Sequence, residues 1–116
     1  MSSQTSQLLW RAQRLTAHAL GLLVLIHLGL MVVAVQGGLT AEEILQRTHG
    51  ALGWLMFYSG FVVLVSIHAP IGLRNILHEQ LGLRQGSALW ISGVYSALLL
   101  ILGLRACWAV FSGGVL

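Results

Sequence analysis

Five histidines are unexpected in a chain of 116 residues in which 57% are apolar and 8% are charged. An imidazole can ligate a metal, transfer a proton or form a hydrogen bond, and a histidine at membrane depth usually has such a function. His27 and His68 lie inside long apolar segments, His18 lies near the start of the first segment, and His49 and His78 lie outside them. We therefore treat the first three as candidate functional residues and expect the other two at the surface.

His68 has the surroundings of a ligand for a flat cofactor. Gly72 lies on the same helical face as His68 and leaves space beside the imidazole, as a planar macrocycle such as haem requires. Arg74 follows at the expected membrane surface, where a guanidinium can pair with the propionate carboxylates. A hydrogen bond from His68 to a Ser or a backbone carbonyl of another helix is the alternative.

The sequence contains no pattern for hydrolytic chemistry, with no nucleophile–base pair, phosphate-binding loop or paired carboxylates. Cys107 is the single cysteine, which excludes an internal disulfide and a cysteine-based metal framework. The apolar segments contain no acidic residue, whereas proton-coupled transport usually requires one. We expect no nucleic-acid partner.

Three helices must position these residues in a membrane. All charged residues are Arg or Glu, and they leave three uncharged segments, at 15–41, 48–73 and 85–104. Each segment reaches the roughly 20 apolar residues that cross a hydrocarbon core about 30 Å thick, and in lipid such segments form helices. We predict one all-α membrane domain over residues 1–116, with helices near 15–36, 50–74 and 88–110.

The segments outside the spans carry weaker signals. Thr40-Ala-Glu-Glu43 matches a capping box and predicts a short interfacial helix over 41–48. The polar residues 2–7 are expected to form a mobile tail. The first apolar run is too long for the core of a signal peptide, so we expect it to be retained as a span.

Arginine placement predicts the orientation, and small residues predict helix contacts. Arg11, Arg14, Arg74 and Arg84 lie on one side of the spans, and Arg47 and Arg105 lie on the other. This asymmetry favours a cytoplasmic N-terminus. Small residues that permit close helix approach are Gly21, Gly29, Gly53, Gly60, Ser92, Gly93, Ser96 and Ala97. Three helices make a thin bundle, so we expect a partner subunit.

The pattern His68, Gly72, Arg74 and Glu79 resembles the second membrane helix of the cytochrome b membrane-anchor subunit of succinate dehydrogenases and fumarate reductases. Three predicted spans in a short chain are also similar to this family. The resemblance implies haem b with His68 as axial ligand of the iron and Arg74 at a propionate. It also implies a quinone substrate near the inner face and a multi-pass protein of the bacterial cytoplasmic membrane.

The resemblance extends to the first span. Arg14-Leu-Thr16 is similar to an Arg and hydroxyl pair near the quinone pocket, although Gln13 and Trp10 stand where the common pattern has His and Ser. Arg14 could instead only fix the topology. The position of His18 suits a role near quinone or a propionate. His27 resembles a ligand of a second, distal haem, and a buried hydrogen-bonded histidine is the alternative.

The same resemblance implies the partners. A second small three-helix subunit would complete a heteromeric bundle and supply the other axial ligand. An iron–sulfur subunit would dock at the inner loop, where Leu81, Leu83 and Arg84 are candidate contacts, and a flavoprotein would carry the dicarboxylate chemistry of the citric acid cycle. Two alternatives stay open, namely an anchor of another quinone-linked dehydrogenase and a small non-redox membrane protein.

Overall fold

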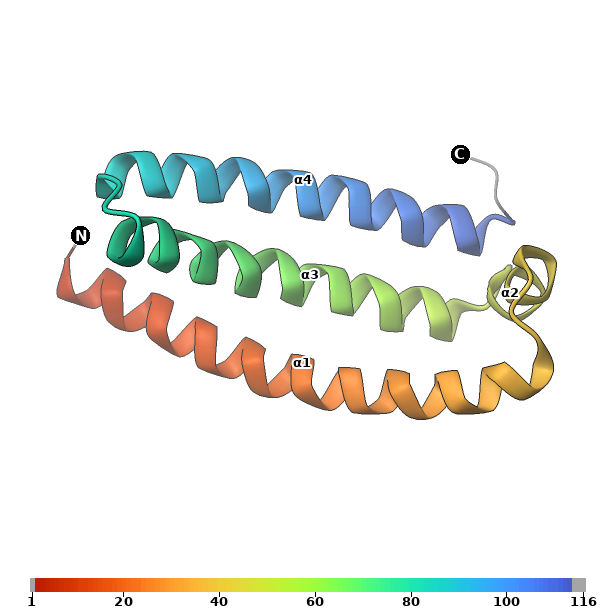
Figure 1. The fold of residues 1–116 in the computed structure, drawn as a ribbon. Helices are drawn as coiled ribbons and strands as arrows, with labels where there is room; N and C mark the ends of the chain where they lie inside the picture. Colours follow the sequence, from red (N-terminus) through yellow and green to blue (C-terminus); the bar gives the residue numbers. More distant parts are fainter. Residues whose placement is uncertain (1, 114–116) are drawn as a thin grey trace.

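The computed structural model describes residues 2–113, and this part of the chain is helical without strands. The elements are α1 (Ser3–Gly37), α2 (Ala41–Thr48), α3 (Leu52–Asn75), a π-helical turn η1 (Ile76–Gln80) and α4 (Gln85–Phe111). The helix α3 lies between α1 and α4, and α2 lies at the end where α1 and α3 connect (Figure 1). The three long helices are long and apolar enough to cross a membrane, which confirms the predicted all-α architecture.

The short helix α2 has the predicted bounds, 41–48, and the predicted cap. The Thr40 Oγ1 accepts a hydrogen bond from the Glu43 backbone N–H at 3.2 Å, and the Glu43 carboxylate accepts one from the Thr40 N–H at 2.9 Å. Hydrogen bonds from the Thr40 backbone and hydroxyl hold the pKa of Glu43 below its usual value, because they stabilise the charged carboxylate. This reciprocal cap fixes where the chain leaves α1 and enters the short helix.

The predicted start of the first helix is wrong. Helix α1 begins at Ser3 rather than near residue 15, and the expected mobile tail at 2–7 is helical. Ser2 supplies the reason, because its Oγ accepts a hydrogen bond from the Thr5 N–H at 3.1 Å and caps the helix. Charge placement locates the part of a helix that lies in lipid, whereas capping decides where the helix begins.

Small and hydroxyl side chains, rather than large apolar ones, fill the contacts between the helices. The buried residues are Thr16, Leu20, Thr48, Ser66, Pro70, Ala88, Ser92 and Cys107. Most large apolar side chains of the spans are exposed instead. This distribution suits helices in lipid, where small residues allow close approach and apolar side chains can face the hydrocarbon.

A hydroxyl from α4 compensates for the proline in α3. Pro70 has no N–H, so the Ser66 carbonyl one turn earlier loses its donor within the helix. The Ser96 Oγ of α4 donates to this carbonyl at 2.7 Å. The helix α3 therefore continues through Pro70, past His68, without leaving the Ser66 carbonyl unsatisfied in the membrane.

Among the glycines of the three long helices, the closest approach of a neighbouring helix is at Gly103, which the sequence analysis did not select. A Cβ atom on Gly103 of α4 would lie 2.5 Å from the Val62 Cγ1 of α3. In contrast, Gly21, Gly29, Gly53, Gly60 and Gly93 have no such neighbour within 4 Å. Of the predicted small residues, Ser92 is buried and Ser96 bonds to α3, while these five glycines make no close contact within the described chain.

Candidate functional site

His68 meets Thr16, a second predicted site residue, across the α1–α3 interface. The His68 Nδ1 lies 3.2 Å from the Thr16 Oγ1, although the two residues are 52 positions apart in the sequence. Thr16 is buried, with 6% of its surface exposed, and His68 is half-buried. The antiparallel course of α1 and α3 creates this pairing, because it places the early part of α1 beside the late part of α3 (Figure 1).

The hydrogen bonds of Thr16 define the state of the His68 ring. The Thr16 Oγ1 lies 2.6 Å from the Ala12 carbonyl and 3.1 Å from the Gln13 carbonyl, and both can only accept. A hydroxyl has one hydrogen, and Thr16 donates it to the Ala12 carbonyl, the nearer of the two acceptors. The oxygen therefore accepts a hydrogen bond from the His68 Nδ1–H, and in the neutral ring the Nε2 then carries the lone pair.

Gly72 borders an open hollow, and the Gln13 amide lies within contact distance of the glycine. His68 and Gly72 line an open hollow of about 460 Å³, together with Gln13, Ala69, Leu73, Ile76 and Tyr95. A Cβ atom on Gly72 would lie 3.5 Å from the Gln13 Nε2. The Gln13 Oε1 is buried without a hydrogen-bond partner in the part of the chain that the structure describes. The hollow thus combines one imidazole, one amide and one phenol with an otherwise apolar lining.

The predicted arginines lie towards the same end of the bundle. Arg74 is half-buried in the last turn of α3, and its Nη1 donates to the Asn75 Oδ1 at 2.8 Å. Arg14 is exposed on α1, with its guanidinium carbon 5.1 Å from the centre of the Trp10 ring. His18 is also exposed on α1. The structure therefore brings Thr16 and Gly72 to His68, while the side chains of Arg14 and His18 face outward.

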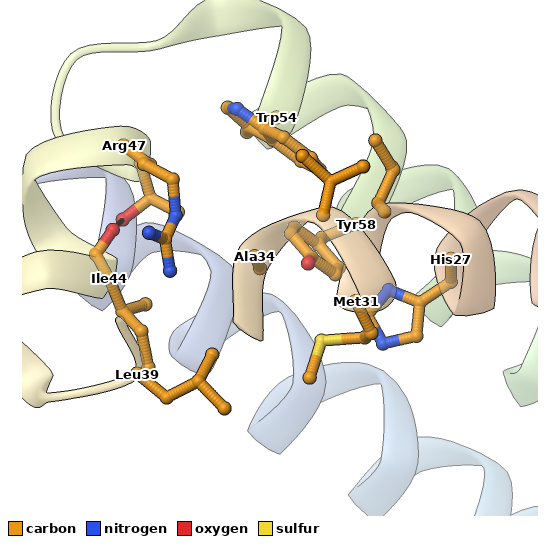
Figure 2. A pocket seen from close by; sticks show the side chains of 11 residues that line it. His27, Met31, Ala34, Leu39, Ile44, Arg47, Trp54 and Tyr58 are labelled. Atoms are coloured by element: carbon orange, nitrogen blue, oxygen red, sulfur yellow. Dashed lines mark hydrogen bonds between the residues drawn. The ribbon is translucent and has the colours of Figure 1, made fainter. Parts of the chain in front are cut away.

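His27 lines a separate cavity near α2, shown in Figure 2. Its ring centre lies 6.5 Å from that of Phe57 and 5.9 Å from that of Tyr58, both on α3. The cavity has a volume of about 240 Å³, and its lining includes Trp54 and Arg47. The His27 Nδ1 is buried, and no described residue forms a hydrogen bond with it.

The remaining histidines are not part of either hollow. His49 is exposed, as predicted. The His78 Nδ1 lies 2.9 Å from the Leu83 carbonyl, so its N–H donates to that carbonyl and closes the turn between η1 and α4. The candidate partner contacts in this turn, Leu81 and Leu83, are 67% and 36% exposed.

The sequence analysis did not select Gln13, Tyr58 or Arg47 as site residues. Gln13 could have been selected, because it stands where the common pattern has a histidine. Tyr58 and Arg47 carry no such signal in the sequence, because only the fold brings them together.

No family model matches the chain, and no curated protein or solved structure matches it. Within the described residues no three His, Cys, Asp or Glu side chains are grouped as metal ligands.

Proposed function

We propose that this chain is the haem b-binding membrane-anchor subunit of a succinate:quinone oxidoreductase of the succinate dehydrogenase or fumarate reductase type. The observation that carries the proposal is the environment of His68. Its Nδ1 is held by a hydroxyl, and its Nε2 lone pair has no hydrogen-bond partner among the described residues. A metal-ligating histidine almost always donates its other N–H to a fixed acceptor, which is the arrangement found here.

The hollow fits one wall of a haem site. Gly72 borders the hollow without adding a side chain to it, and Ala69, Leu73 and Ile76 would provide apolar contacts for a macrocycle. The described residues bring no second histidine to this hollow. We therefore propose that the second axial ligand comes from another chain, the partner subunit that the sequence motif implies.

The other residues would bind charge and substrate. A bound haem would supply one-electron transfer between a docked iron–sulfur subunit and membrane quinone. We assign Arg74 to a haem propionate, and Arg14 and His18 to the quinone side at the cytoplasmic face. We assign Thr16 to His68 rather than to quinone, because its hydroxyl is already engaged by Ala12 and His68.

The further partners follow from this assignment. A second three-helix anchor, an iron–sulfur subunit and a flavoprotein would complete the complex in the bacterial cytoplasmic membrane, and the N-terminus would be cytoplasmic. The dicarboxylate chemistry would take place on the flavoprotein, since this chain offers no residues for it.

The test is purification of the complex through a tag on this chain, followed by a reduced-minus-oxidised spectrum. We expect haem b in the wild type, a more than tenfold loss of the haem signal that depends on His68 in His68→Ala, and full retention in the matched control His49→Ala. We also expect flavin and iron–sulfur subunits to co-purify, with succinate-dependent quinone reduction. An intact complex without haem, or a spectrum unchanged by His68→Ala, would refute the proposal.

A further inference from the structure

Thr16 is unusually constrained for a hydroxyl residue on a membrane helix. It is buried, and its Oγ1 contacts the Ala12 and Gln13 carbonyls on one side and the His68 Nδ1 on the other. A Thr hydroxyl in a helix commonly bonds back to a carbonyl one turn earlier. Here that back-bond has a second effect, because it turns the oxygen lone pairs towards the imidazole of the neighbouring helix.

We propose that Thr16 is a positioning residue that sets the tautomer and the electron donation of the haem ligand His68. This inference rests on the proposed haem site. Because the contact with Thr16 keeps Nδ1 protonated, Nε2 is the nitrogen that would offer its lone pair to a haem iron. An acceptor at the Nδ1–H also makes the imidazole a stronger donor, which favours ferric over ferrous iron and lowers the reduction potential.

The experiment compares Thr16→Val with Thr16→Ser in the purified complex. Valine keeps the shape and removes the acceptor, whereas serine keeps the hydroxyl. We expect Thr16→Val to raise the midpoint potential of the haem. At a fixed potential the ferric-to-ferrous ratio should then fall about tenfold, which corresponds to a shift of about 59 mV for a one-electron couple. Thr16→Ser should restore the wild-type potential.

Thr48→Val is the matched control. Thr48 is also buried, and its hydroxyl reaches another helix by contacting the Val110 carbonyl at 3.1 Å, but it is the last residue of α2 and lines the His27 cavity, not the hollow at His68. This variant should leave the midpoint potential and the ferric electron paramagnetic resonance signal of the haem held by His68 unchanged. A merely structural role of Thr16 would change complex yield without changing the potential.

The outcomes separate this inference from the proposed function. Haem at full occupancy in Thr16→Val, with unchanged potential and resonance signal, overturns the role of Thr16 and leaves the haem site intact. Wild-type complex without haem overturns the site itself. If Thr16→Val does not assemble, Thr16→Cys replaces the hydroxyl by a weaker acceptor. An upward shift in Thr16→Cys supports the inference, and a wild-type potential overturns it.

Discussion

At the scale of single residues, His68 and His27 are two imidazoles on apolar helices with opposite hydrogen-bond environments. The His68 Nδ1 has a hydroxyl acceptor, whereas the His27 Nδ1 is buried among residues 2–113 without a partner. An unsatisfied buried polar group costs about 1–3 kcal/mol, so such a group in a membrane helix calls for an explanation. The resemblance of the first span offers one, because it makes His27 a candidate ligand of a second, distal haem.

His27→Phe tests that assignment, because phenylalanine keeps a ring beside Phe57 and Tyr58 but cannot ligate iron. We expect the variant complex to lose one of two haem signals in a potentiometric titration of the reduced-minus-oxidised spectrum, and to keep the signal that depends on His68. His49→Ala serves again as the control. Two unchanged signals would leave His27 with packing as its only role.

At the scale of helices, the contact between α3 and α4 depends on the absence of a side chain at Gly103. We expect Gly103→Ala to destabilise the protein by about 1–3 kcal/mol, because its methyl group would overlap Val62. Gly93→Ala on the same helix meets no atom within 4 Å and should be neutral or slightly stabilising, since alanine favours a helix over glycine. Reversible unfolding in detergent measures both effects.

A double-mutant cycle completes this prediction. Val62→Ala should lose packing on its own, but combined with Gly103→Ala it should provide the space for the new methyl group. We therefore expect the double variant to be more stable than the sum of the two single losses. Additive losses would show that the contact of Gly103 with Val62 does not limit the approach of the two helices.

The helices also show what the sequence can and cannot predict. Nine charged residues were enough to locate three spans, and the Thr40–Glu43 pattern predicted α2 with its exact bounds, because both signals are local. The start of α1 was missed because a serine cap acts outside the lipid-spanning segment. A hydrogen bond from His68 to another helix was expected only as the alternative, to a Ser or a carbonyl, and Thr16 could not be named as its partner because the contact depends on the register between two helices.

At the scale of the whole molecule, the chain resembles one layer of a larger bundle. Only 6% of the residues in each apolar window are buried. The helix α3 is the middle helix (Figure 1), and it nevertheless keeps a stripe of exposed residues. The stripe consists of Gly53, Met56, Gly60, Val63 and Ile67. Spacings of alternately three and four residues form the seam along which a second helix packs, and the two glycines permit a close approach.

We therefore expect the proposed second anchor subunit to pack against this stripe. Gly60→Leu adds a large side chain where the structure has open space, so the variant chain should fold as before. A pull-down through this chain should nevertheless recover at least about tenfold less of the second subunit than the wild type does. Gly93→Leu places the same side chain in the open space beside α4 and should recover normal amounts. Equal recovery with both variants would exclude the stripe as the contact, whereas loss confined to Gly93→Leu would move the interface to α4. If the second axial ligand comes from that subunit, as proposed, Gly60→Leu should also lower the haem content of the complex in proportion to the subunit lost.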